Sequence, residues 1–238
     1  MSGYPIARES GSKLQPRLSS SMRFPTTEAL LFDLGGVLLD IDFSRAIAAW
    51  EPYSALAPDV LRNTFKHDEY YARHERGEIT SKEYFAYLAT SLQLTASFAQ
   101  IEQGWNAIFV GEIQKTRELV ESMQGMLPCY AFTNTNASHM AKWSELFPNV
   151  VGAFDRIFAS HQMGLRKPER AAFDHICALT NIPAAKFLFF DDLSENVQAA
   201  RDAGLQGVLV QSPDDVAAAF RSYGYLPAFT TEVAGNGQ

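Results

Sequence analysis

The sequence predicts an α/β protein in which a doubly wound parallel sheet carries an inserted α-helical cap domain. Three observations lead there: short, mostly apolar runs, helical segments between them, and a long insert after the first run with no convincing strand pattern. Short apolar runs without polar alternation are typical of strands buried on both faces of a parallel sheet. The predicted strands are Ala29–Phe32, Cys129–Phe132, Arg156–Ala159, Phe187–Phe190 and Gly207–Val210.

Helical segments separate most of these strands. The last one is followed by Gly204, at the position where a left-handed residue commonly ends a helix. Strands that alternate with helices indicate a doubly wound α/β core. The predicted core helices are Glu112–Met123, His139–Leu146, Glu169–Leu179 and Glu195–Ala203.

The insert after the first strand is far longer than the ~2–6 residues of an ordinary βα loop, so it must fold by itself. Its Ala, Leu, Tyr and Phe residues recur at helical spacing. Thr80 and Glu83 form a capping-box pattern, which predicts a helix start there. The predicted cap helices are Phe43–Trp50, Asp59–His74, Ser81–Leu92 and Phe98–Phe109.

These elements predict a domain plan. Residues 28–42 and 112–230 would form the core, and residues 43–111 would form the helical cap. Residues 1–27 are Ser-rich and slightly basic, without the apolar stretch of a secretory signal, so we expect a disordered tail there and a second tail at 231–238.

Composition narrows the function classes. The formal net charge of −7 disfavours a nucleic-acid partner, which would need clustered Lys and Arg, so we expect a small-molecule substrate instead. No run approaches the ~18 apolar residues of a membrane span. Cys129 and Cys177 lack metal-site spacing, which favours two thiols in a reducing compartment. We expect a cytoplasmic monomer or homodimer without a membrane partner.

Polar residues follow three of the predicted strands. Asp33 follows the first, Thr133 and Asn134 the second, and Asp191 with Asp192 the fourth. Because ligands of open α/β sheets bind at the carboxyl ends of the strands, these side chains should converge. Three carboxylates at one edge repel one another unless a cation joins them, and an all-oxygen set suits Mg²⁺.

The remaining groups in this set suit a phosphoryl ligand. Lys167 supplies positive charge, and the side chains of Thr133 and Asn134 can donate hydrogen bonds to phosphoryl oxygens. A carboxylate in line with phosphorus can act as a nucleophile and form an aspartyl-phosphate that water later hydrolyses. Asp33 is the candidate nucleophile.

Four motifs in this order resemble the haloacid dehalogenase superfamily, and the helical insert resembles its subclass with an α-helical cap. They are Asp33-Leu-Gly-Gly-Val-Leu-Leu-Asp40, Phe132-Thr-Asn-Thr-Asn136, Lys167-Pro168 and Phe190-Asp-Asp192. Further segments, including His74-Glu-Arg-Gly-Glu-Ile79 and Gly164-Leu-Arg-Lys-Pro168, are similar to bacterial α-D-glucose-1-phosphate phosphatases.

The resemblance implies a Rossmann-like core and a set of site roles. Asp33 would be the nucleophile and a metal ligand, the Gly35 carbonyl a backbone ligand, and Asp191 with Asp192 would complete the Mg²⁺ site. Thr133, Asn134 and Lys167 would hold the phosphoryl group and act with Asp33 in catalysis.

The sequence departs from the superfamily pattern at Gly35, where most of its phosphatases carry an Asp that protonates the leaving oxygen. Losing such an acid typically costs ~10²–10⁴-fold in rate. The departure favours a leaving group that hardly needs a proton, such as the hemiacetal oxygen of a sugar 1-phosphate. His74, or a water held by the cap, is the candidate replacement.

Four cap residues are tentative substrate contacts: Arg73, His74, Arg76 and Trp105. A charged helix end explains the first three equally well, and aromatic residues at helical spacing most often fill a core. Asp42, which precedes a predicted helix, is more simply a helix N-cap than a ligand.

Two other function classes stay open at this stage. A 2-haloacid dehalogenase-type hydrolase needs no acid at Gly35, but it has no use for the acidic pair Asp191 and Asp192. A protein that only binds or accepts phosphate is the second alternative, although a response-regulator receiver would carry its acidic pair after the first strand and would be much shorter.

Overall fold

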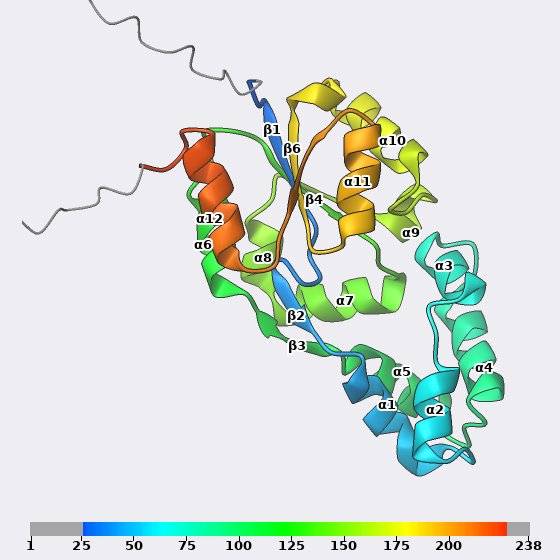
Figure 1. The fold of residues 1–238 in the computed structure, drawn as a ribbon. Helices are drawn as coiled ribbons and strands as arrows, with labels where there is room; N and C mark the ends of the chain where they lie inside the picture. The colour runs from blue at the N-terminus through cyan, green and yellow to red at the C-terminus, as the bar shows by residue number, and fades with distance from the viewer. Residues whose placement is uncertain (1–25, 228–238) are drawn as a thin grey trace, which may run out of the picture.

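The computed structural model describes residues 26–227, and its centre is a five-stranded sheet in the order β5-β4-β1-β6-β7 (Figure 1). Every neighbouring pair in this sheet is parallel. The predicted fold class is therefore confirmed. The strands are β1 Ala29–Phe32, β4 Cys129–Thr133, β5 Arg156–Ala159, β6 Phe187–Asp191 and β7 Gln206–Leu209.

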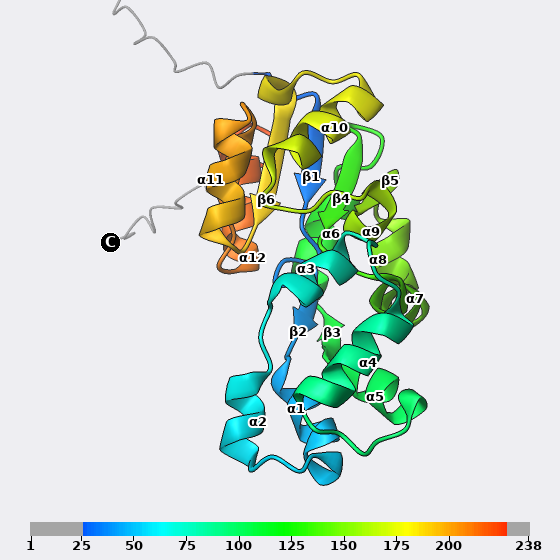
Figure 2. The same ribbon diagram turned by 90° about the vertical axis from the view of Figure 1, so that its right-hand side faces the viewer.

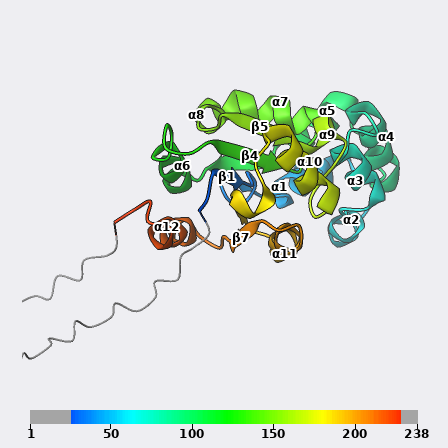
Figure 3. The same ribbon diagram turned by 90° about the horizontal axis from the view of Figure 1, so that it is seen from above.

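Helices cover both faces of this sheet. Alternate residues of β1 point to opposite faces, so Leu30 and Phe32 pack in one apolar layer and Leu31 in the other. The first layer includes residues of α6 (Gln114–Glu121), α7 (Ala137–Leu146), α8 (Pro148–Gly152) and α12 (Pro213–Ser222). The second includes residues of α10 (Arg170–Thr180) and α11 (Ser194–Asp202), while the short α9 (Ser160–Met163) follows β5. Figure 3 shows these layers from above.

The insert packs around its own apolar cluster, below the sheet in Figure 2. Trp50, Tyr84, Phe85 and Trp105 are fully buried there. The predicted capping box is confirmed, since the Thr80 side chain accepts from the backbone of Glu83 and the Glu83 side chain accepts from that of Thr80. The helices are α1 Ser44–Trp50, α2 Pro58–Thr64, α3 Glu69–Glu75, α4 Ser81–Ser91 and α5 Phe98–Asn106. Short 3-10 helices occupy Glu51–Tyr53 and Ala184–Lys186.

Two short strands at the ends of the insert were not predicted from the sequence pattern. β2 (Leu39–Ile41) and β3 (Phe109–Glu112) pair in antiparallel fashion and link the insert to the core. Each is too short to show a clear alternation, and Phe109 completes the aromatic spacing of the preceding helix. The predicted helices that ended at Phe109 and began at Glu112 were therefore too long.

One predicted cap helix, Asp59–His74, was wrong as a single element. It is broken between α2 and α3, where Phe65 has an extended backbone and Asp68 caps α3 by accepting from the Tyr71 amide at 3.0 Å. The local capping of α3 lets it take a direction different from α2. The domain boundaries stay a prediction. The predicted tail 231–238 lies wholly outside the described residues, and of the predicted tail 1–27 only residues 26 and 27 are described.

Cys129 lies buried in β4 and Cys177 lies in α10, both as free thiols. Among residues 26–227, no helix combines the length and apolar character needed to cross a membrane.

Candidate active site

Three carboxylates meet at the carboxyl edge of the sheet. Asp33 directly follows β1, Asp191 ends β6, and Asp192 comes next in the chain. The strands β1 and β6 are neighbours with Phe32 paired to Phe190, so the residues that follow them emerge side by side. One oxygen of each carboxylate lies within 4.8 Å of the others. The sequence-predicted convergence of these acids is present in the structure.

Lys167 joins two of the acids from the loop between α9 and α10. Its Nζ lies 2.8 Å from Asp33 Oδ1 and 2.7 Å from Asp191 Oδ2, and only 1% of the side chain is exposed. Asn134, just after β4, fixes the backbone there, because its Oδ1 accepts from the Lys167 amide at 2.8 Å and its Nδ2 donates to the Lys167 carbonyl at 2.9 Å. The Asn134 side chain therefore also positions Lys167, a role that the sequence did not predict.

The charges of this cluster fit a divalent cation. Burial raises the pKa of Asp33 to about 7, with Asp191 adding to the rise and Lys167 opposing it. Burial alone would lower the pKa of Lys167, but the two carboxylates raise it above its usual value, so the lysine stays charged. Three carboxylates and one ammonium leave two negative charges, which one hard, oxygen-binding cation such as Mg²⁺ would balance. Such a cation would return Asp33 to its ionised form.

Asp191 is completely buried and is oriented by a residue that the sequence argument missed. Asn196 Nδ2 donates to both carboxylate oxygens, at 3.0 and 3.1 Å, and the Leu193 amide donates to Oδ1 at 2.9 Å. A polar residue on the first turn of α11, facing back toward the acidic pair, was the available signal. These bonds fix the Asp191 carboxylate against Lys167.

The glycine pair after the nucleophile candidate leaves room for the acids. Gly36 has a φ of +71°, and a Cβ there would lie 2.3 Å from Asp192 Oδ2, so a side chain at this position would displace that carboxylate. Gly35 lies beside it in the wall of the site cavity. The structure thus places the predicted metal-ligand residues Asp33, Gly35, Asp191 and Asp192 together.

A cavity of about 300 Å³ opens over this cluster, between the core and the cap. The core contributes the charged groups at the sheet edge, while helix α3 and the residues around it contribute a second wall. The lining residues are Asp33, Gly35, Ile41, Phe43, His67, Tyr71, Glu75, Asn134, Arg166, Lys167, Asp192, Leu193 and Asn196.

Two predicted cap contacts, His74 and Trp105, are not in this wall. His74 is 2% exposed, stacks on Tyr84 at 4.4 Å between ring centroids, and shares a hydrogen bond with Ser81. Trp105 is fully buried and donates to Asn136 Oδ1 at 3.3 Å. Both side chains lie in the interior of the cap or where the cap packs on the core, because they are on the inward-facing sides of their helices.

Arg73 and Arg76 do not line the cavity either. Arg73 pairs with Glu78 at 3.3 Å, and Arg76 pairs with Glu69, Glu78 and, across to the core, Glu169 at 3.2 Å. Surface ion pairs therefore occupy these guanidinium groups. Their neighbours in the chain, Tyr71 and Glu75, are the α3 residues that face the site.

Thr133 ends β4 and is 5% exposed, but it is not among the lining residues.

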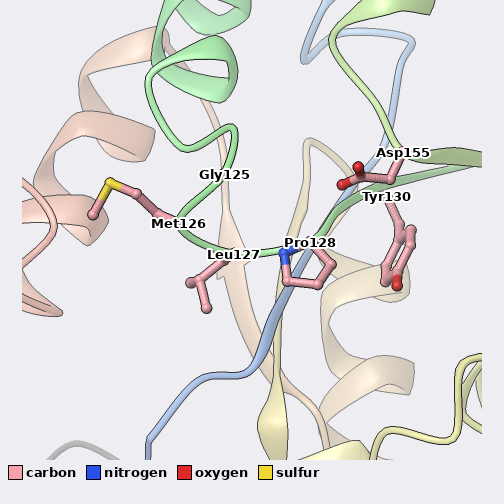
Figure 4. Close-up of a pocket in the computed structure, with 6 residues that line it drawn as sticks. All are labelled: Gly125, Met126, Leu127, Pro128, Tyr130 and Asp155. Atoms are coloured by element: carbon pink, nitrogen blue, oxygen red, sulfur yellow. The ribbon is translucent and has the colours of Figure 1, made fainter.

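A separate hollow of about 390 Å³ lies near the amino ends of β4 and β5, at the far end of the sheet (Figure 4). Its walls are Gly125, Met126, Leu127, Pro128, Tyr130 and Asp155. It holds none of the groups of the acidic cluster.

The chain belongs to the haloacid dehalogenase-like hydrolase family, whose sequence model matches residues 27–204. The resemblance inferred from the four motifs is therefore confirmed at the level of the family.

Two curated relatives are phosphatases. The chain is 21% identical over 182 residues to D-ribitol-5-phosphate phosphatase from Bacteroides thetaiotaomicron, a match that covers 74% of this chain and 88% of that protein. It is 26% identical over 185 residues to the sesquiterpene phosphatase astK from Aspergillus oryzae, covering 77% of this chain and 89% of that protein.

A solved structure shares the fold. A haloacid dehalogenase family enzyme from Bacteroides thetaiotaomicron, crystallised in complex with magnesium and inorganic phosphate, superposes with a TM-score of 0.73 at 26% sequence identity. The match covers 82% of this chain and all of that chain.

Proposed function

We propose that this hydrolase is a Mg²⁺-dependent phosphatase that acts on a small phosphate ester, and that the ester is a sugar phosphate such as a sugar 1-phosphate. The observation that carries the proposal is the set of three carboxylates and one buried lysine at one sheet edge. The two phosphatase relatives and the solved enzyme with magnesium and phosphate support the same chemistry.

In this mechanism Asp33 attacks phosphorus with one carboxylate oxygen while the bond to the leaving oxygen breaks, which gives an aspartyl-phosphate. Water then hydrolyses that acyl phosphate, and phosphate departs. Bound Mg²⁺ would neutralise phosphoryl charge, held by Asp33, Asp192, the Gly35 carbonyl and, directly or through water, Asp191.

Lys167 would hold the phosphoryl group as a cation close to the nucleophile. Asp191 and Asn134 keep its ammonium and its backbone in place. The proposal keeps Thr133 and Asn134 as phosphate contacts. The Asn134 side chain also holds the backbone of Lys167.

The choice of leaving group follows from Gly35. No acid stands at this position, and His74 lies outside the cavity wall. Glu75, the carboxyl that the cap contributes to the cavity, is paired with Arg166 at 2.8 Å, and this ion pair opposes its protonation. A leaving group that departs without full protonation therefore suits the site, as the anomeric oxygen of a sugar 1-phosphate does.

The proposed setting is the cytoplasm, with a small phosphorylated metabolite as partner. Free thiols at Cys129 and Cys177 agree with a reducing compartment. A monomer or homodimer stays a prediction.

The test is a screen of sugar 1-phosphates, other sugar and polyol phosphates, nucleotides and phenyl phosphate, with Mg²⁺ and with EDTA. We expect hydrolysis only with Mg²⁺, and recovery when Mg²⁺ is returned. Turnover that persists in EDTA would contradict a Mg²⁺-dependent phosphatase. Absence of multiple turnover on every ester would favour a phosphate-binding protein.

A further inference from the structure

A second polar cluster lines the cavity, opposite the acidic edge. Tyr71 and Glu75 lie one turn apart on α3, so both side chains face the same way, and His67 stacks on Tyr71 with 4.1 Å between ring centroids. Arg166, the residue before Lys167, completes the cluster from the core. Neither the acidic site nor the proposed chemistry uses these four side chains.

Glu75 and Arg166 form a tight pair across the boundary of cap and core. Arg166 Nε and Nη2 both lie 2.8 Å from Glu75 Oε2, and 5% of the Glu75 side chain is exposed. Burial raises the pKa of Glu75, while Arg166 and the hydroxyl of Tyr71 oppose the rise. A carboxylate has about four acceptor sites and a guanidinium has five N–H groups, so the pair keeps capacity for more hydrogen bonds.

The Glu75–Arg166 pair is not required as a link between the cap and the core. Arg76 and Glu169, next to Glu75 and close to Arg166 in the chain, already form a second ion pair between the same two segments. That pair lies outside the cavity wall, whereas Glu75 and Arg166 are part of it. The two pairs have opposite polarity, with the acid from the cap in one and from the core in the other. Burying two charges in a cavity wall costs desolvation energy, which their attraction repays only with good geometry and further hydrogen bonds to the remaining donors and acceptors.

We propose that Glu75 and Arg166 are specificity-determining residues that hydrogen-bond hydroxyl groups of the leaving group, which makes the preferred substrate a polyhydroxylated phosphate ester. The inference rests on the proposed phosphatase function and deepens it. Glu75 accepts from hydroxyls, Arg166 donates to them, and Tyr71 holds the carboxylate.

The pair also selects against apolar esters. An apolar leaving group would cover the carboxylate and the guanidinium without replacing their hydrogen bonds to water, and a site built for hydroxyls rejects analogues that lack them. Phenyl phosphate therefore serves as the hydroxyl-free probe, with glucose 1-phosphate and ribitol 5-phosphate as the hydroxylated ones.

The experiment compares kcat/KM of wild type and Glu75→Gln on these three esters with Mg²⁺. For each protein, the ratio of hydroxylated ester to phenyl phosphate cancels the effects of the substitution on the shared phosphoryl chemistry. We expect Glu75→Gln to lower this ratio about 10-fold or more, chiefly through the KM of the hydroxylated esters.

Glu169→Gln is the matched control, since it weakens the other cap–core ion pair, while its amide oxygen can still accept from the Arg166 backbone N–H, as Glu169 Oε2 does at 3.4 Å. It should keep the wild-type ratio. Tyr71→Phe, which removes one hydroxyl only, gives a second reading if Glu75→Gln folds poorly, and we expect it to lower the same ratio by about 3-fold.

An equal loss on hydroxylated and apolar esters in Glu75→Gln, or a matching drop of the ratio in Glu169→Gln, would show a structural tie and overturn the inference. A wild type that hydrolyses phenyl phosphate but does not prefer the hydroxylated esters overturns it while the phosphatase proposal stands. A wild type that hydrolyses no ester overturns both.

Discussion

The two walls of the site cavity are built in different ways. In the core wall, Asp33, Asp191 and Asp192 come at the ends of neighbouring parallel strands, and the strand residues before them, Phe32 and Phe190, are fully buried. In the cap wall, Tyr71 and Glu75 come from a two-turn helix whose other residues enter the cap interior or the surface.

The difference teaches where a sequence reveals function. A strand end fixes where the next residue goes, because the sheet holds its neighbours in register. The side chains of a short helix point in all directions, and the way the helix packs on the rest of the protein decides which of them face the ligand. Core-wall substitutions should therefore abolish chemistry, while cap-wall substitutions should change selectivity or stability.

The largest expected effect is that of Asp33→Asn. An amide cannot attack phosphorus as a carboxylate does, so Mg²⁺-dependent turnover should fall by about 10³-fold or more. Asp40→Asn, which changes an exposed acid on β2 of the same motif, is the control and should retain activity. Appreciable turnover by folded Asp33→Asn, checked by circular dichroism, would remove Asp33 from the nucleophile role.

Lys167→Met tests how far the core wall depends on its cation. The substitution leaves two buried carboxylates without their shared partner, and breaking a buried ion pair costs about 3–5 kcal/mol. In EDTA at pH 8 the free energy of unfolding should fall by that order, and added Mg²⁺ should restore part of it. A thermal unfolding temperature equal to that of wild type in EDTA would contradict this account.

Acid should destabilise the protein through two buried histidines, His74 on the cap helix α3 and His139 on the core helix α7, where it stacks on Trp105 of the cap. Burial lowers the pKa of His74 to about 4, with nearby His161 adding to the effect, and burial lowers the pKa of His139 to about 3. The unfolded chain binds these protons below its ordinary histidine pKa of about 6.5, whereas the folded protein resists them. Each histidine therefore costs stability as pH falls from about 6.5 toward 4, by about 1.4 kcal/mol per pH unit.

Urea unfolding at several pH values checks this slope. His74→Gln should lose the contribution of one histidine to this pH dependence. Above pH 7.5, the free energies of unfolding of the variant and of wild type should change with pH in parallel. A slope unchanged in the variant would mean that His74 takes up its proton in the folded state as readily as in the unfolded chain.

The smallest effect concerns local structure of the cap. Thr80→Ala removes the side-chain acceptor of the Glu83 amide and should lower the free energy of unfolding by about 1 kcal/mol. Thr80→Ser keeps that acceptor and is the control. Equal stability of the two variants would show that the capping box adds nothing beyond the packing of α4.

The sequence predicted the core site better than the cap site. The five strands and the acidic cluster followed from apolar runs that end in polar residues. Arg73, His74, Arg76 and Trp105 were predicted at the substrate because they stand in a charged or aromatic segment, yet their contacts lie elsewhere. The β2–β3 ribbon was missed because each strand is too short to carry a periodic pattern.

The sequence by itself determined the residues that a backbone regularity places: the acids after β1 and β6, and the capping box of α4. Only the tertiary structure decided which α3 residues face the cavity, because consecutive residues of a helix point to different faces and the docking of the helix selects one face. It also decided the contact of Lys167 with Asp33 and Asp191, since a long side chain from a loop reaches its partners only when the fold brings them together.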